Sequence, residues 1–336
     1  MGFATRKAAL EWERSFLDQG AKSPDILFSS LVKNYMEDNE TRLKPTTLEN
    51  KQSIFDDKIT PYFGNVKISN IDAVMIRKWQ NELLSYRSKD GEPYAPTYLK
   101  TIHAQLSAIT NYAVKYYGLP SNPCHVSGSI GKSNAGEMSI WTREQFEYFI
   151  TFEKHYSFHC AFNTLFYTGM REGELLALTP QDILVDEKSI SINKNYAVVK
   201  GDEYFLTPKT DKSKRIITIH KQLCDELQAY ISSMCINPDE RIFYFTKSGL
   251  SKEFARVTDR AELPHIRIHD LRHSHASMLI QMKVPITEIS KRLGHESPEI
   301  TLRIYSHLYP GNERNVPNLI DALFEPESME NMDDSE

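Results

Sequence analysis

The stretch from His269 to Tyr305 constrains this chain more than any other part of its sequence. It reads H-D-L-R-H-S-H-A-S, then fifteen mostly apolar and basic residues, then L-G-H-E-S-P-E-I-T-L-R-I-Y. The apolar spacing and the Gly and Pro breaks predict three short helices. These helices bring His269, Arg272, His295 and Tyr305 into one short segment. One phenol beside so many cationic or proton-carrying groups indicates phosphate chemistry without a metal.

The first third of the chain has a helical pattern throughout. Thr46 with Glu49 forms a capping-box signature, and apolar residues recur at helical spacing from Leu99 to Tyr116. The pattern predicts a small all-helical domain at residues 25–118. Residues 119–139 that follow are rich in Pro, Ser, Gly and Asn, a composition typical of an interdomain linker.

The second predicted domain covers residues 140–311 and changes its periodicity in the middle. It begins with helices, the first of them capped by Thr142 and Gln145. Alternating or extended segments then occur at residues 189–193, 196–200, 203–206 and 215–219. They predict a small antiparallel sheet of about three strands, before helices resume. The predicted fold class is therefore mainly α with a small antiparallel β-sheet, an α+β fold.

Two candidate residues lie upstream of the opening stretch. Arg171, in T-G-M-R-E-G-E-L, is expected in the first turn of a helix with Glu174 on the same face, where free N–H groups favour anions. Lys209, in L-T-P-K-T-D-K-S-K-R, is expected at a turn between strands, from which it can reach a cleft and donate a proton. The alternatives are a surface Arg–Glu pair and an ordinary basic hairpin tip.

The candidates inside the opening stretch also have plain structural interpretations. His269 and Arg272 lie at i and i+3 and can grip two oxygens of one phosphate, or serve as a helix cap and a surface pair. His295 follows Gly294, the expected left-handed end of a helix, and projects away from it. Tyr305 lies two turns into the next helix, where an isolated tyrosine often packs half-buried.

A zinc site is the competing hypothesis for the histidines. His269 and His273 lie at i and i+4, the spacing of a helical zinc pair. The glutamate of H-E-x-x-H is missing, however, no cysteine is close, and Arg272 lies between the two rings. The sequence therefore predicts neither a metal nor another cofactor.

The composition is typical of an ordinary globular protein and is compatible with a nucleic-acid partner. No run approaches the roughly 20 apolar residues of a membrane span, and the four cysteines form no C-x-x-C pair, which fits a cytoplasmic protein. The net charge of −5 argues mildly against a nucleic-acid partner. The acidic residues of 325–336 carry much of it, and without them the charge is about +1, so the body can present a basic face.

Five motifs in order resemble the tyrosine recombinases, also called phage-type integrases. They are T-G-M-R-E-G-E-L, P-K-T in a basic segment, H-D-L-R-H-S-H-A-S, L-G-H and T-L-R-I-Y-S-H. The likeness spans about residues 25–310 and is greatest to integrases of phages and conjugative transposons. It implies that residues 25–118 form a core-binding domain, which closes a clamp on duplex DNA with a catalytic domain at residues 140–311.

The resemblance also implies a role for each candidate. Tyr305 matches the nucleophile, and Arg171 and Arg272 match the pair that binds the scissile phosphate. His269 and His295 match the two further site residues, Lys209 matches the lysine that protonates the leaving 5′ oxygen, and Glu174 matches the supporting acid. The expected function is site-specific DNA integration and excision through a 3′-phosphotyrosyl intermediate. The alternatives are type IB topoisomerase-like relaxation and an inactive DNA-binding protein.

The expected partners are double-stranded DNA, three further copies of the chain in a tetramer, and accessory excision or host DNA-bending factors. A location in the bacterial cytoplasm, on the nucleoid, follows. Integrases of this type usually carry an N-terminal arm-binding domain, of which residues 1–24 resemble only the final helix; a truncated chain and a gene without that domain both stay open. Residues 312–324 predict an amphipathic helix that docks on its own domain or on a neighbour, and residues 325–336 a disordered acidic tail.

Overall fold

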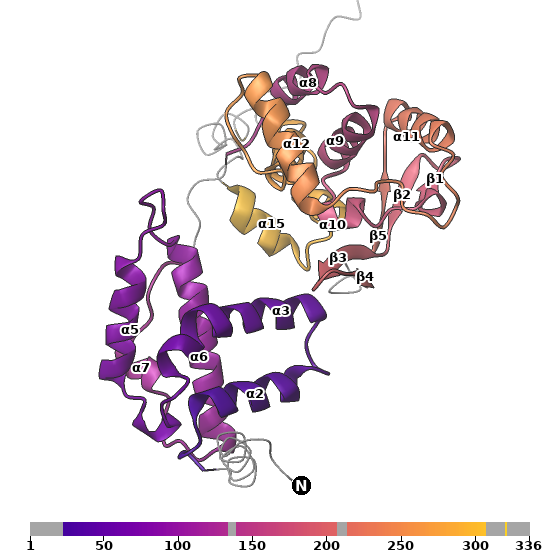
Figure 1. Ribbon diagram of the computed structural model, residues 1–336. Helices are drawn as coiled ribbons and strands as arrows, with labels where there is room; N and C mark the ends of the chain where they lie inside the picture. The colour runs from indigo at the N-terminus through magenta and orange to yellow at the C-terminus, as the bar shows by residue number, and fades with distance from the viewer. Residues whose placement is uncertain (1–22, 134–138, 207–213, 307–319, 321–336) are drawn as a thin grey trace, which may run out of the picture. The chain divides into compact units, whose positions relative to one another are not determined.

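The computed structural model describes residues 23–133, 139–206, 214–306 and 320. The described chain divides into two compact units: the residues before 139 with 197–204 in one, and 139–196 with those after 204 in the other. Helices dominate and the strands are antiparallel, so the predicted α+β fold class is confirmed (Figure 1). Within the described residues, no helix has the length and apolarity to cross a membrane.

The first unit is helical apart from residues 197–204, which lie in two strands and the turn between them. Its helices are α2 (Phe28–Asn39), α3 (Pro45–Ile54), α4 (Thr60–Phe63), α5 (Ala73–Ser85), α6 (Pro96–Tyr116) and α7 (Pro123–Ser127). A π-turn, Phe55–Ile59, joins α3 to α4. A π-turn disturbs the regular carbonyl ladder, and here the carbonyl of Lys58 accepts a hydrogen bond from the indole of buried Trp79 at 2.9 Å. The expected cap at Thr46 is wrong, because the helix begins one residue earlier with Pro45 at its first position.

The interpretation of residues 119–139 as a linker is wrong for their first half. Leu119, Cys124 and Ile130 are buried in the core of the first unit, and α7 packs against α5 and α6. The side chain of Asn122 caps α7 by accepting from the backbone N–H of Cys124 at 2.9 Å. It also accepts from the hydroxyl of Thr110 at 2.8 Å and donates to the carbonyl of Ser107 at 3.1 Å. A composition typical of linkers here builds a capped helix.

The second unit surrounds one buried helix, α9 (Tyr156–Thr168). The other helices are α8 (Arg143–Thr151), α10 (Glu172–Leu175), α11 (Lys221–Ser233), α12 (Lys247–Arg260), α13 (Asp270–Gln281), α14 (Ile286–Leu293) and α15 (Pro298–Tyr305). The capping box predicted at Thr142 and Gln145 is present at the start of α8. Helices α8, α10, α11 and α13 all pack on α9, and α14 packs on α13, on α15 and on strand β5 (Arg215–Thr218).

The strands form two sheets instead of the single sheet expected. They are β1 (Ile183–Leu184), β2 (Ser189–Ile192), β3 (Asn195–Val199), β4 (Asp202–Leu206) and β5 (Arg215–Thr218). β2 pairs antiparallel with both β1 and β5, with Ile190 opposite Ile183 and Ile217, while β3 pairs with β4. Alternation predicted the strands but not their partners, because the period of a strand does not say which neighbour it joins.

The Asn122 network predicts a measurable contribution to stability. Asn122→Ala leaves the hydroxyl of Thr110 and an N–H of α7 without this acceptor inside the core. We expect a loss of about 2–4 kcal/mol in the free energy of unfolding, because buried polar groups left unpaired are costly. Urea denaturation of the full chain measures it. Asn81→Ala, on the exposed side of α5, is the matched control and is expected to change little. Equal effects of the two substitutions would refute the structural role of residues 119–130.

Candidate active site

The turn between α9 and α10 places Arg171. Gly169 ends α9 in the left-handed conformation at φ +65°. A Cβ at Gly169 would come within 2.6 Å of the His275 ring and 2.9 Å of the Leu293 side chain. Only glycine therefore satisfies both the backbone and the packing there. Arg171 follows as the residue that caps the N-terminus of α10, close to the helix start that the sequence predicted.

The carboxylate of Glu174 holds two arginines. Its oxygens accept from Nη1 of Arg171 at 2.9 Å and from Nη1 and Nη2 of Arg215 at 3.1 and 2.8 Å. It also accepts from the backbone N–H of Arg171 at 2.8 Å. Burial raises the pKa of Glu174, but the hydrogen bonds and charge of Arg215, followed by the charge of Arg171, outweigh it and lower the pKa to about 2. The predicted Arg171–Glu174 contact is thus present, and the carboxylate is ionised.

Arg215 ties strand β5 to the end of α14. Its Nε donates to the carbonyl of Arg292 at 2.7 Å. Its guanidinium passes against Gly294, where a Cβ would lie 2.9 Å from Nη1. Gly294 ends α14 at φ +67°, as the sequence predicted, and its lack of a side chain lets Arg215 reach Glu174.

Arg272 is buried beneath the ends of two helices. Nη1 donates to the carbonyl of Gly169 at 2.7 Å, and Nη2 donates to the carbonyl of Leu293 at 2.6 Å. Burial, followed by the charge of Arg171, lowers the pKa of Arg272 to about 9, so the group stays protonated at neutral pH. These bonds use two of the five N–H donors of a guanidinium; in the part of the chain that the structure describes, three donors remain for an anion.

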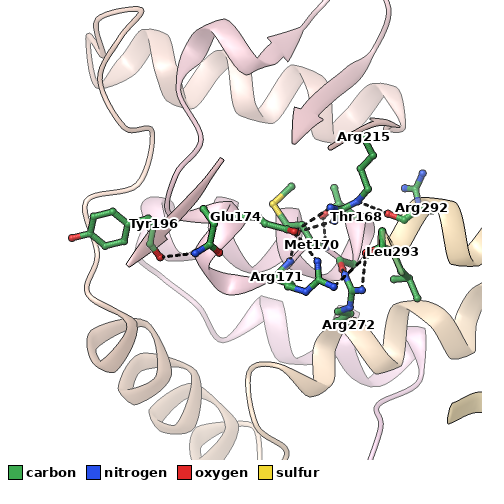
Figure 2. Close-up of polar contacts among 12 residues, drawn as sticks. Thr168, Met170, Arg171, Glu174, Tyr196, Arg215, Arg272, Arg292 and Leu293 are labelled. Atoms are coloured by element: carbon green, nitrogen blue, oxygen red, sulfur yellow. Dashed lines mark hydrogen bonds and ion pairs between the residues drawn. The ribbon is translucent and has the colours of Figure 1, made fainter. Parts of the chain in front are cut away.

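Arg171 and Arg272 converge on the same short piece of backbone. Nη2 of Arg171 reaches the carbonyl of Gly294 at 3.5 Å, next to the Leu293 carbonyl that Arg272 binds. Figure 2 shows Arg171, Arg215 and Arg272 meeting there from different elements. His295 is the next residue, and its Nδ1 lies 2.7 Å from the hydroxyl of Thr301. Burial and the charge of Arg272 lower the pKa of His295 to about 3, so its ring is neutral.

Tyr305 ends α15 with a fully buried side chain. Its phenol oxygen lies 2.6 Å from Nδ1 of His273. Burial raises the pKa of Tyr305 to about 12, against the opposing charge of Arg272. His269 is exposed at the start of α13 and meets the ring of His273 edge-on at 5.4 Å between centroids. Desolvation, followed by the charge of Arg272, lowers the pKa of His269.

The structure brings together most of the predicted site. Arg171, Arg272, Glu174 and His295 meet directly or through the Leu293–Gly294 backbone, and Tyr305 and His269 both meet His273. Lys209 lies outside the described residues. The described strands before and after it, β4 and β5, pair with β3 and β2 respectively, and the predicted place and role of Lys209 stay predictions.

Sequence reasoning missed two residues of this cluster. His273 was considered only as a zinc ligand, although its place one residue after Arg272 was a signal that it belongs near the site. Arg215 was considered only as a basic neighbour of Lys209, and nothing in the local sequence shows that it pairs with Glu174. Among the described residues, no group of three or more His, Cys, Asp or Glu side chains gathers as a metal site.

The arrangement is suited to bind an anion beside a phenol. Two guanidinium groups bind one carboxylate and the guanidinium of Arg272 lies on the adjoining backbone, which leaves an excess of positive charge in a largely buried region. Arginine forks match the oxygens of a phosphate group, and buried cations gain most from such a partner. A buried phenol beside these cations is a group of the kind that can attack such a phosphate.

Comparisons with known proteins identify the family of this chain. The family model "Phage integrase family" matches residues 142–311, and "Phage integrase, N-terminal SAM-like domain" matches residues 27–84. The ICEBs1 integrase of Bacillus subtilis (strain 168) is 29% identical, covering 95% of this chain and 91% of its own length. The integrase of Staphylococcus phage L54a is 24% identical, covering 89% of this chain and 93% of its own length.

Two solved structures share the fold. The Tn1549 transposon integrase in complex with transposon right end DNA has a TM-score of 0.68 at 16% identity, covering 88% of this chain and 99% of that one. The lambda integrase tetramer bound to a Holliday junction has a TM-score of 0.63 at 16% identity, covering 94% of this chain and 89% of that one. With the matched family model over half of its length, this chain belongs to the phage integrase family and is a tyrosine recombinase, an enzyme that cleaves and rejoins DNA.

Proposed function

We propose that this recombinase integrates and excises a mobile element at specific DNA sites through a covalent 3′-phosphotyrosyl link to Tyr305, without a metal ion or ATP. One observation carries the proposal: the buried phenol of Tyr305 contacts His273 at 2.6 Å, His273 directly follows Arg272 on α13, and Arg272 shares the Leu293–Gly294 backbone with Arg171. A phosphate held by these two guanidinium groups has a tyrosine nucleophile near it.

The proposed roles follow the chemistry of each side chain. Arg171 and Arg272 bind the non-bridging oxygens of the scissile phosphate, and His269 and His295 add hydrogen bonds around it. Lys209 protonates the leaving 5′ oxygen. Glu174 orients Arg171 through the 2.9 Å bond between their side chains. Each preorganised donor of this kind contributes about 10²–10³ in rate to charge stabilisation.

The covalent intermediate explains how the reaction conserves energy. Attack by the Tyr305 oxygen forms a phosphotyrosyl diester and releases the 5′ hydroxyl of the broken strand. The new ester retains the energy of the old one, so a 5′ hydroxyl from another strand can reverse the step without ATP.

The proposed assembly is a tetramer of this chain on duplex DNA. The support is the fold shared with the lambda integrase tetramer on a Holliday junction and the Tn1549 integrase on transposon-end DNA. Accessory excision or host DNA-bending factors, and a cytoplasmic location on the nucleoid, stay predictions. The C-terminal segment 312–324, expected to dock within the tetramer, lies almost wholly outside the described residues.

A nicked suicide substrate tests the proposal. Such a duplex is built from the ends of the element, with a nick close to the cleaved bond. After cleavage the short fragment that carries the new 5′ hydroxyl diffuses away, so rejoining is blocked and the covalent adduct is trapped. The adduct is expected with the wild-type chain, and its absence on the correct site would overturn the enzymatic mechanism. Exchange between two sites then separates a recombinase from a topoisomerase-like enzyme, which would relax supercoils without joining different duplexes.

Tyr305→Phe is expected to abolish the adduct and to leave DNA binding within about threefold of wild type. It removes only the phenol oxygen and keeps the buried ring of α15 in place. Denaturing gels measure the adduct and gel shifts measure binding. Tyr148→Phe, on the exposed side of α8, is the matched control. Adduct formation by Tyr305→Phe would show that another residue is the nucleophile.

Arg272→Lys is expected to slow cleavage by about 10²–10³, even though it keeps the charge. A single ammonium cannot reach the carbonyls of Gly169 and Leu293 and also present a fork to phosphate. Single-turnover cleavage at a temperature where circular dichroism shows the variant folded gives the rate. Arg260→Lys, on the exposed surface of α12, controls for the exchange of arginine for lysine. A rate within threefold of wild type would contradict the assigned role.

Glu174→Gln is expected to destabilise the protein most at neutral pH. In the folded protein the pKa of Glu174 is about 2, which is below its pKa in the unfolded chain. The ionised carboxylate therefore stabilises the fold fully at a pH above the unfolded pKa, and this stabilisation is lost as the pH falls toward about 2. A shift of this size corresponds to roughly 3 kcal/mol at most. Urea denaturation from pH 7 to pH 3 should show the difference between wild type and variant shrinking, and a constant difference would refute the buried ion pair. Glu288→Gln, exposed on α14, controls for the lost charge.

A further inference from the structure

The phenol of Tyr305 has a specific partner that the family motifs do not assign. Nδ1 of His273 lies 2.6 Å from the phenol oxygen, with the two ring centroids 5.6 Å apart. Tyr305 is fully buried, so this contact replaces water at the phenol. A short contact between an ionisable oxygen and a neutral ring nitrogen is the geometry of a nucleophile with its base.

The position of His273 on α13 places it between the phenol and the phosphate site. Arg272, one residue earlier, turns its guanidinium to the carbonyls of Gly169 and Leu293. His273 turns to α15 and meets Tyr305. Neighbouring residues on a helix point about 100° apart, so α13 can serve both groups at once. Among the described residues, the ring nitrogen that contacts the phenol oxygen is Nδ1 of His273, while Nδ1 of His295 contacts the hydroxyl of Thr301 and His269 meets only the edge of the His273 ring.

We propose that His273 is a catalytic residue, the general base that takes the proton of Tyr305 during strand cleavage and returns it during rejoining. The proposal rests on the proposed function of Tyr305 as the nucleophile. His273 contacts the phenol oxygen that reacts, whereas Arg171 and Arg272 contact only the phosphate in the proposed function.

The proton balance is closed within the site. The neutral imidazole, protonated at Nε2, accepts the phenol hydrogen at Nδ1 as the Tyr305 oxygen bonds to phosphorus. The bond from phosphorus to the 5′ oxygen breaks, and that oxygen takes a proton from Lys209. In rejoining, the 5′ hydroxyl attacks phosphorus and gives its proton back to Lys209. The bond from phosphorus to the phenol oxygen breaks, and that oxygen regains its proton from the imidazolium of His273. No other reactant is needed.

The charges around His273 keep it ready to accept that proton. Burial, followed by His269, lowers the pKa of His273 to about 4, so the ring is neutral at pH 7. The titratable and charged groups that act on it are His269, Asp270 and Arg272 at the start of α13, Arg267 before the helix, Tyr305 on α15 and His295 before α15. Asp270 alone among those acting on its pKa opposes the shift.

Two variants separate proton transfer from hydrogen bonding. His273→Asn keeps an acceptor close to the position of Nδ1 but cannot take a proton at neutral pH. His273→Ala removes both. The full chain is used, with single-turnover cleavage of a suicide substrate as the readout. His155→Asn, at the start of α9 and about 20 Å along that helix from Gly169, is the matched control.

The substrate is made in two forms, with an ordinary 5′ oxygen or a bridging 5′ sulfur at the cleaved bond. A sulfur leaving group needs no proton, so it rescues the loss of a general acid and not the loss of a general base. We expect His273→Asn to be slower than wild type by about 10²–10⁴ on both substrates. Lys209→Ala is expected to recover on the sulfur substrate. Failure of wild type to form any adduct would overturn the proposed function itself, which is a distinct outcome.

The pH profile on the sulfur substrate provides the second readout. Wild type is expected to cleave at a nearly constant rate from about pH 6 to pH 9, because the neutral His273–phenol pair persists throughout. His273→Asn is expected to gain about tenfold per pH unit, because only the phenolate then reacts. Parallel profiles, with a uniform loss in the variant, would mean a structural role and overturn the proposal. Faster cleavage by His273→Ala would mean that His273 only restrains Tyr305, and would overturn it equally.

Discussion

The buried carboxylate of Glu174 is the interaction on which the catalytic unit depends. It joins α10, which carries Arg171, to strand β5, which carries Arg215, and Arg215 in turn bonds the last turn of α14. A buried ion costs several kcal/mol unless it is fully paired, and here four hydrogen bonds from two arginines offset that cost. Three elements far apart in sequence are thereby held around one charge.

Arg272 uses the same principle without a carboxylate. It donates to the carbonyls of Gly169 and Leu293, at the C-terminal ends of α9 and α14, where helix dipoles favour a cation. The residue that binds phosphate in the proposed mechanism therefore also fastens two helices. Its buried charge has carbonyl dipoles as partners in the free protein, and a phosphate oxygen adds a full negative charge. The fold thus holds the charged guanidinium of Arg272 in place before a phosphate binds, and the bound phosphate stabilises that charge further.

Prediction from sequence succeeded where one local pattern decides the outcome and failed where packing decides it. Gly294 and Pro298 ended and began helices as expected, and this brought His295 and Tyr305 to their places. No spacing shows that α15 turns Tyr305 toward His273, or that Arg215 crosses Gly294 to reach Glu174. The composition of residues 119–130 does not show that they pack in the core, because their Pro, Ser and Asn content resembles a linker, while Asn122 bonds four neighbours there, Ser107, Thr110, Asn111 and Cys124.

The burial of Tyr305 makes its phenol harder to ionise, and the neighbouring groups have to compensate for this. With a pKa of about 12, roughly one phenol in 10⁵ is ionised at pH 7, so a mechanism through free phenolate begins with a large penalty. In the proposed mechanism the proton moves to His273 across the 2.6 Å contact as the bond to phosphorus forms, so no free phenolate has to accumulate. Arg272, which binds phosphate in that mechanism, also weakens this base, because its charge lowers the pKa of His273. A bound phosphate offsets their charge, so the base strengthens when its substrate is in place.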